Sequence, residues 1–233
     1  AGLVAEMRGR IAEVDASVPE ADGPFLYYQR YEAGGEHPLL CRRPAGDGVG
    51  ADAPEQVILD GPAEAAGRSY WRLAGFLQAP DHRTAAVAVD RDGSEFCEIH
   101  FRDLETGAVL PDVLRSAQGD VTWANDGRTV FYTVLDAAHR PSRVYRHRLG
   151  DDAAHDALVY EEADPGFYLH VERTDSRRYV LIKARAHDTT SEIWLIDADA
   201  PDRLPVLFAP RESGHDYDIV HVPQVHGGRF FIR

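Results

Sequence analysis

The sequence predicts an all-β fold, namely part of a β-propeller with about three and a half four-stranded blades and a short N-terminal helix. The first observation is a polar turn that occurs three times, at residues 79–83, 124–128 and 174–178. The aspartates of these turns are 45 and 49 residues apart, at Asp81, Asp126 and Asp175. A period of about 40–50 residues made of short strands is typical of propeller blades.

The second observation concerns the residues directly after each turn. Three continuous apolar runs of strand length begin there, at residues 84–89, 129–135 and 179–182. They are too short for a typical helix and rich in β-branched and aromatic residues, so we expect strands buried on both faces. The next run of each unit predicts a further strand, at 96–101, 142–147 and 192–196. Short runs at 157–160 and 205–208 then predict outer strands, which gives the four strands of a blade.

A fourth unit begins at 217–222, and the chain stops within its second strand, at Arg233. Because a propeller ring typically needs four to eight blades, we expect this chain to be part of something longer, or to be completed by a partner. The expected organisation is an N-terminal helical segment at 1–20, a hairpin and loop at 21–70, and an incomplete propeller at 71–233. The propeller units are expected at about 71–115, 116–163, 164–213 and 214–233.

The first 70 residues differ from the repeats. Val4, Met7, Ile11 and Val14 recur at helical spacing, which predicts an amphipathic helix over residues 2–15.

After this helix, two apolar runs at 25–31 and 38–43 flank a Glu-Ala-Gly-Gly turn and predict a hairpin. The segment 44–54 is rich in glycine, proline and aspartate and predicts a loop. Residues 56–60 predict an isolated strand that leads into the first blade.

Four residues stand out as candidates for the core. Trp71, Trp123 and Trp194 are expected inside the blades, because large aromatic side chains fill the space between sheets. The two cysteines, Cys41 and Cys97, are too few for a disulfide scaffold. Cys97 lies in an apolar strand pattern, which predicts a buried free thiol in a reducing compartment.

Composition narrows the classes of partner. The chain has 44% hydrophobic and 27% charged residues, which is typical of globular proteins. Its net charge of −14 argues against nucleic acid and anionic membrane surfaces as partners, because both are negatively charged. It has no run of about 18 apolar residues that would predict a membrane span, and its N-terminus lacks the apolar core of a signal peptide. We therefore expect a cytoplasmic protein.

A search for nucleophiles and cofactor motifs assigns no catalytic and no cofactor-binding residue. The sequence has no Gly-x-Ser-x-Gly elbow, no phosphate-binding loop and no dinucleotide fingerprint. Ser94 and Ser213 come nearest to a nucleophile motif, and both are expected to be turn serines. We therefore expect no cofactor.

A search for metal ligands assigns none either. Cys97 and His100, three apart on one strand, should point to opposite faces. His215, His221 and His226 are interpreted as ordinary strand and turn histidines, because a zinc site needs three or four converging ligands. Residues 90–93 match only half of a calcium loop and predict a hairpin turn instead.

Several short motifs, taken together, point to a known family. The densest are Tyr27-Tyr28-x-Arg30, Cys41-Arg42-Arg43, Asp103-Leu104-x-Thr106-Gly107, Val144-Tyr145-Arg146-His147 and Ser191-Glu192-Ile193-Trp194. In these motifs the chain resembles the N-terminal, β-propeller portion of the prolyl oligopeptidase family of serine peptidases, in its oligopeptidase B (protease II) branch.

This resemblance implies a seven-bladed propeller that caps an α/β-hydrolase domain of the same parent protein. In such enzymes the catalytic serine, histidine and aspartate lie in that hydrolase domain, so no catalytic position carries over to these 233 residues. The implied substrates of the parent are short peptides cut after Arg or Lys, which the propeller admits while it keeps folded proteins out. The helix at 2–15 would pack against the hydrolase domain. The parent is then an enzyme, and this chain alone is not.

A second interpretation stays open. The chain could be a stand-alone, β-propeller-like protein-interaction module without enzymatic activity. Open propeller edges would also allow it to form an oligomer.

Overall fold

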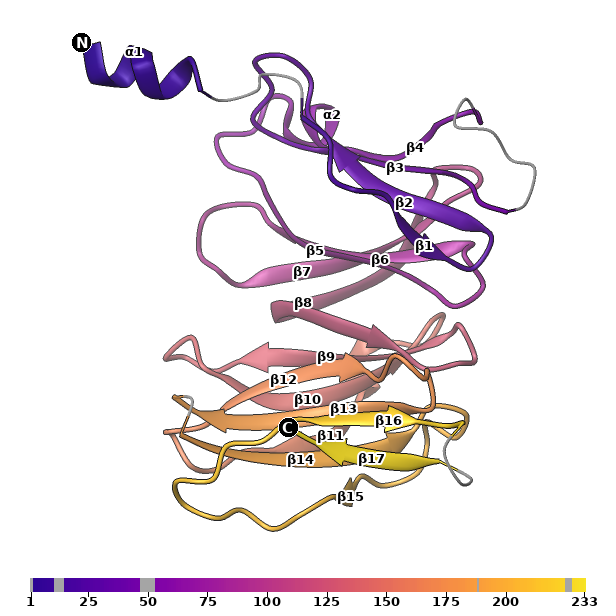
Figure 1. Cartoon of the computed structure of the whole chain (residues 1–233), viewed down its shortest axis with the longest axis vertical. Helices are drawn as coiled ribbons and strands as arrows, with labels where there is room; N and C mark the ends of the chain where they lie inside the picture. Colours follow the sequence, from indigo (N-terminus) through magenta and orange to yellow (C-terminus); the bar gives the residue numbers. More distant parts are fainter. Residues whose placement is uncertain (1, 11–14, 47–52, 188, 225–227) are drawn as a thin grey trace. The chain divides into compact units, whose positions relative to one another are not determined.

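Figure 1 shows the computed structural model of the chain, which describes residues 2–10, 15–46, 53–187, 189–224 and 228–233. The fold is all-β with little helix, as predicted. The chain separates into two compact units, Ala1–Arg72 and Leu73–Arg233. None of the helices in the described residues has the length and apolar character needed to cross a membrane.

In its described residues, the first unit holds two short helices and one four-stranded sheet. The helices are α1 (Gly2–Arg8) and α2 (Gly61–Ala65). The sheet has the order β1-β2-β3-β4, with β1 at Glu20–Asp22, β2 at Phe25–Arg30, β3 at Leu39–Pro44 and β4 at Gln56–Asp60. The predicted hairpin is the antiparallel pair β2–β3.

Two expectations for this unit were wrong, and one is only partly described. The strand at 56–60 is not isolated, because β4 pairs with β3 and buries Ile58 and Leu59. Helix α2 was not predicted, and the Asp60 side chain caps it by accepting a hydrogen bond from the Ala63 amide at 2.9 Å. Of the helix predicted over 2–15, α1 covers Gly2–Arg8, and residues 11–14 lie outside the described residues, as do 47–52 of the predicted loop.

The second unit consists of strands joined by short turns. The first seven are β5 (Arg72–Gln78), β6 (Thr84–Asp90), β7 (Cys97–Asp103), β8 (Val109–Trp123), β9 (Thr129–Leu135), β10 (Pro141–Arg148) and β11 (Ala157–Glu161). A short 3-10 helix, η1 (Ala153–His155), precedes β11. The others are β12 (Tyr168–Arg173), β13 (Tyr179–Ala186), β14 (Thr190–Asp197), β15 (Val206–Leu207), β16 (Ile219–Val222) and β17 (Arg229–Ile232).

These strands form three sheets in which neighbours along the chain are neighbours in space. The orders are β11-β10-β9-β8-β7-β6-β5, then β12-β13-β14-β15, then β16-β17. The central strands β6, β9 and β13 are buried almost throughout, as their apolar sequences predicted. Each therefore needs a covering layer on both faces.

Strand β8 has 15 residues and serves two groups of strands. Its first part pairs with β7 at Cys97–Ala117, and its last part pairs with β9 at Val130–Trp123. In Figure 1 it lies between the two groups. The place where the sequence divides the first two propeller units, at 115/116, falls inside this strand, so the unit boundaries remain a proposal.

The repeated turns share one hydrogen-bond pattern. The amide of the first residue in each turn donates to the carbonyl five residues later, in the pairs Ala79–Thr84, Ala124–Thr129 and Thr174–Tyr179. The fourth residue has a positive φ each time: 58° at His82, 65° at Gly127 and 59° at Arg177.

The side-chain acceptors in these turns correct one sequence alignment. Asp81 accepts from the amide of Arg83 and Asp126 from that of Arg128, both at 2.9 Å. In the third turn the equivalent acceptor is the Ser176 hydroxyl, and not Asp175. The sequence comparison matched the aspartates by residue type and missed that serine fills the same role in an ST-turn.

Trp123 anchors the core of the second unit. Its side chain is completely buried, stacks edge-on against Phe101 at 5.8 Å, and donates a hydrogen bond to the Leu77 carbonyl at 3.0 Å. Trp194 is half-buried against the neighbouring core cluster, and Trp71 is buried in the first unit. Both cysteines are buried and form no disulfide, which confirms that Cys97 is a buried thiol.

A buried histidine lies between two carboxylates in the seven-stranded sheet. His147 on β10 is fully buried, with Nδ1 2.7 Å from Asp156 and Nε2 3.1 Å from Asp112 of β8. Tyr132 donates to Asp156 at 2.8 Å, and the Gly150 amide donates to Asp112 at 2.7 Å. Burial lowers the pKa of His147, but the two carboxylates outweigh it, so the pKa lies above its usual value. The charged imidazolium can donate to both acids, and this links β8 to the end of β10.

Gly127→Ala should destabilise the chain by about 1–2 kcal/mol, which is the cost of a side chain in the left-handed region. The added Cβ would meet only ordinary contacts, at 3.7 Å from Asp81, so the effect should be conformational. Urea unfolding followed by tryptophan fluorescence measures it. Gly2→Ala is the control, because its Cβ would meet nothing within 4 Å and Gly2 lies in helix α1. Equal stabilities for the Gly127→Ala variant and the wild type would contradict this prediction.

The His147 contact predicts a pH dependence of stability. Because the folded pKa is raised, its stabilisation is complete below the unfolded pKa of about 6.5 and is lost as pH rises through the folded pKa. His147→Gln should cost about 3 kcal/mol at pH 6, because two buried carboxylates lose their cation.

The measurement is the free energy of unfolding between pH 6 and pH 9, for the wild type, His147→Gln and the exposed control His155→Gln. The wild type and the control should lose stability with rising pH more steeply than His147→Gln. Three parallel curves would show that His147 is not the group responsible.

Candidate functional site

Strand β12 presents an alternating row of polar side chains. Tyr168, His170 and Glu172 are exposed, while Leu169 and Val171 between them are buried in the core. The alternation follows from the period of two in a strand, so the three polar side chains share one face. On the paired strand β13, Lys183 lies opposite His170 and Arg185 lies opposite Tyr168.

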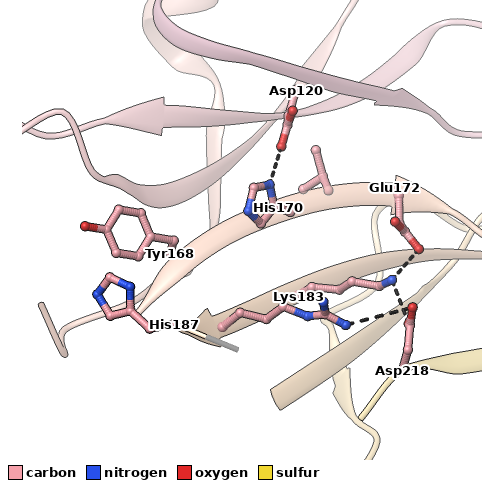
Figure 2. A pocket seen from close by; sticks show the side chains of 9 residues that line it. Asp120, Tyr168, His170, Glu172, Lys183, His187 and Asp218 are labelled. Atoms are coloured by element: carbon pink, nitrogen blue, oxygen red, sulfur yellow. Dashed lines mark hydrogen bonds and ion pairs between the residues drawn. The ribbon is translucent and has the colours of Figure 1, made fainter. Parts of the chain in front are cut away.

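This polar face borders a hollow of about 630 Å³, which we call the β12 hollow (Figure 2). Its lining residues are Asp120, Tyr168, His170, Val171, Glu172, Lys183, Arg185, His187 and Asp218. They come from β8, β12, β13, the end of β13 and the residue before β16. Two sheets of the second unit therefore contribute strand residues to it, and Asp218 comes from the residue directly before the third.

Lys183, which is the only lysine of the chain, is the central cation of the hollow. Its ammonium lies 2.6 Å from Glu172 and 2.7 Å from Asp218, and the side chain is only 8% exposed. Figure 2 shows the two carboxylates on either side of it. The contact joins β12, β13 and the start of β16 across two sheets.

The Asp218 carboxylate accepts hydrogen bonds from several donors. Burial raises the pKa of its carboxyl, but the hydrogen bonds from Lys183, the Ile219 amide and Arg233 outweigh it and hold the pKa at about 2. Arg185 adds a longer contact, at 3.9 Å. Asp218 is therefore a carboxylate at every physiological pH.

A second contact ties β8 to β12. Nδ1 of His170 lies 2.8 Å from Asp120, and both side chains remain partly exposed. At the other end of the row, the rings of Tyr168 and His187 meet edge to face at 5.8 Å. The hollow thus offers exposed oxygen acceptors, aromatic faces and a buried ammonium, which suits the binding of a polar or charged group.

The residues weighed as sites from the sequence do not meet here. Cys97 contacts the Gln118 carbonyl at 3.2 Å, whereas His100 contacts Glu98 at 3.1 Å from the other face of β7. The Ser94 hydroxyl donates to Asp92 within a turn, and Ser213 lies in an exposed turn.

The candidate metal ligands are also dispersed. His215 lies near Glu212 at 3.7 Å, His221 contacts Ser176 at 2.8 Å, and His226 lies outside the described residues. Residues 90–93 form a turn in which Asp90 accepts from the amides of Asp92 and Gly93. Within the described part of the chain, no three His, Cys, Asp or Glu side chains converge closely enough to hold a metal ion.

Sequence reasoning missed the β12 hollow. Its members are spread from Asp120 to Asp218, and only the strand pairing brings them together. Two signals were present: the polar alternation over 168–172 and the single lysine in an arginine-rich chain.

Lys183 and Asp218 should be energetically coupled. Lys183→Met should cost about 2 kcal/mol, because the carboxylates lose a buried cation but Glu172 can still be hydrated. In a double-mutant cycle with Asp218→Asn, measured by urea unfolding, the coupling should exceed about 1 kcal/mol. Effects that add within about 0.5 kcal/mol would contradict the contact. Glu212→Gln is a matched control, because this carboxylate is 80% exposed and lies outside the hollow.

Comparison with known proteins gives consistent results. The family model described as "Prolyl oligopeptidase, N-terminal beta-propeller domain" matches residues 1–233. The chain is 36% identical to a dipeptidyl aminopeptidase BI of Pseudoxanthomonas mexicana, over 99% of this chain and 33% of that protein. It is 33% identical to a protease 2 of Moraxella lacunata, over 92% of this chain and 31% of that protein.

Solved structures agree with these relatives. The structure of oligopeptidase B from Leishmania major matches with a TM-score of 0.87 and 26% identity, over 99% of this chain and 34% of that one. Oligopeptidase B from Trypanosoma brucei matches with a TM-score of 0.84 and 28% identity, over 100% of this chain and 34% of that one. This chain therefore spans about a third of the length of the proteins it matches.

Proposed function

Because this chain belongs to the prolyl oligopeptidase family, as part of its N-terminal β-propeller, we propose that it is the non-catalytic, substrate-gating portion of a serine oligopeptidase. The observation that carries the proposal is the family match over residues 1–233, together with the fold shared with oligopeptidase B. The names of the relatives, a protease and a dipeptidyl aminopeptidase, support peptides as the substrate class.

The chemistry belongs to an α/β-hydrolase domain of the same parent protein. There, a serine whose proton passes to a histidine, held by an aspartate, attacks the peptide carbonyl. The peptide C–N bond breaks as the histidine gives that proton to the leaving amine, and water then hydrolyses the acyl-serine ester. This chain contributes the wall past which a substrate travels, and it holds back folded proteins that are too large to enter.

Cleavage after Arg or Lys forms part of the proposal. It is supported by the resemblance to the oligopeptidase B branch and by the net charge of −14, which attracts cationic peptides to the surface. A cytoplasmic location is proposed as well, and the two buried free thiols support a reducing compartment.

The parent protein should hydrolyse a short fluorogenic peptide after Arg, and should leave a folded protein with exposed arginines intact. The 233-residue chain alone should hydrolyse neither, and a serine-reactive phosphonate should label only the parent. The readouts are fluorescence release and intact mass.

Two outcomes would contradict the proposal. One is phosphonate labelling of the isolated chain, which would place a nucleophile within it. The other is a parent protein that cleaves no peptide at all, which would favour the stand-alone interaction module.

A further inference from the structure

We propose that the β12 hollow is a subsite for a cationic side chain of a peptide, with Asp120 and Glu172 as acceptors. The inference rests on the proposed function for its ligand class, because that function supplies peptides as substrates. It adds a location and a chemical preference within the propeller itself.

First, the most exposed charges of the hollow are negative. The Glu172 carboxylate is 51% exposed and that of Asp120 is 35% exposed, whereas Lys183 is only 8% exposed. The lysine is also bound by two carboxylates at 2.6 and 2.7 Å. A molecule that enters the hollow therefore meets these acceptor oxygens before it meets the ammonium. Arg185, at 31%, is the more exposed of the two cations.

The second step is the balance of charge. The lining holds three carboxylates and two permanent cations, so the hollow is negative when its histidines are neutral. Asp216, 4.0 Å from Arg185, adds a negative charge beside the hollow, and Arg233, 3.2 Å from Asp218, adds a positive one, so the balance stays negative. Arg185 itself faces Asp216 and Asp218. Lys183 is bound by two acids and Arg185 lies within 4.0 Å of two, one of which they share, so the remaining negative charge favours a ligand that brings its own positive charge.

The third step is geometry. Glu172, His170 and Tyr168 stand in one row on β12, and Asp120 approaches His170 from β8, as Figure 2 shows. A guanidinium is planar, carries five donors and can donate to more than one carboxylate. A hollow of about 630 Å³ has room for one such side chain with its water. Arginine fits this arrangement best, and lysine can use the same acceptors with fewer hydrogen bonds.

Binding to the 233-residue chain tests the proposal directly. The probe is a short peptide, acetylated and amidated, with one central arginine. Its partner carries citrulline, which keeps the shape of arginine but removes the charge. At low salt the arginine peptide should bind about tenfold more tightly than the citrulline peptide, because one charge-assisted hydrogen bond contributes about that factor to the affinity. Equal affinities of the unmodified chain for the two peptides would overturn the proposal.

Variants then assign the preference to the hollow. The double variant Asp120→Asn with Glu172→Gln keeps oxygen acceptors for His170 and Lys183, so the fold should persist, which circular dichroism checks. It should lose the preference for arginine, while Glu212→Gln should retain it. A double variant that still prefers arginine would overturn the proposal, even with binding intact elsewhere on the chain.

The binding experiment can fail or succeed independently of the test of the proposed function. Peptide binding to this chain requires no hydrolysis, so an inactive parent would leave a measured arginine preference standing. Conversely, a parent that cleaves after Arg, combined with a chain that binds both peptides equally, would overturn only the subsite.

Discussion

The structure depends on one constraint: its central strands are apolar on both faces. Strands β6, β9 and β13 are buried almost throughout, so no single sheet of this chain can satisfy them. Each sheet must be covered by another sheet, and a chain of similar units meets this need by stacking them in order. The regular turns, the short connections and the large buried aromatic residues such as Trp123 all serve that stacking.

Polar contacts join neighbouring layers once the apolar faces have met. Asn125 reaches the Arg177 carbonyl and Asp199 across two sheets, at 2.9 and 2.7 Å. Arg211 lies over the ring of Phe167 at 3.6 Å and binds Glu162. Such contacts are directional, so they select one alignment of the layers where apolar packing alone would accept several. The β12 hollow contains polar contacts of the same kind between sheets, and it differs from the others in being open to water.

The fold was largely predictable from the sequence, because a buried strand with a polar turn leaves a clear local pattern. The features that the sequence did not predict also have physical reasons. The side chain that closes the third turn is Ser176, since an oxygen acceptor at the right position matters more than an aspartate. The strand β4 seemed isolated because its partner β3 lies a loop away along the chain. The hollow escaped prediction because Asp120, Lys183 and Asp218 meet only through pairing that no local pattern encodes.

Strand β8 has a mechanical consequence. Its 15 residues are hydrogen-bonded to β7 at one end and β9 at the other, so the first two groups of strands share one continuous backbone. Between β11 and β12 no such strand runs in the described part of the chain. The layers are held there by the main-chain hydrogen bond from the Asn125 amide to the Ala198 carbonyl, at 2.9 Å, and by side chains such as those of Asn125 and Arg211. A force that separates the layers would therefore meet a continuous, hydrogen-bonded strand at β8 and a more easily opened interface between β11 and β12. The β12 hollow is lined from β8 on one side of this interface and from β12 on the other. A ligand bound there would therefore also affect how far the two sheets can separate.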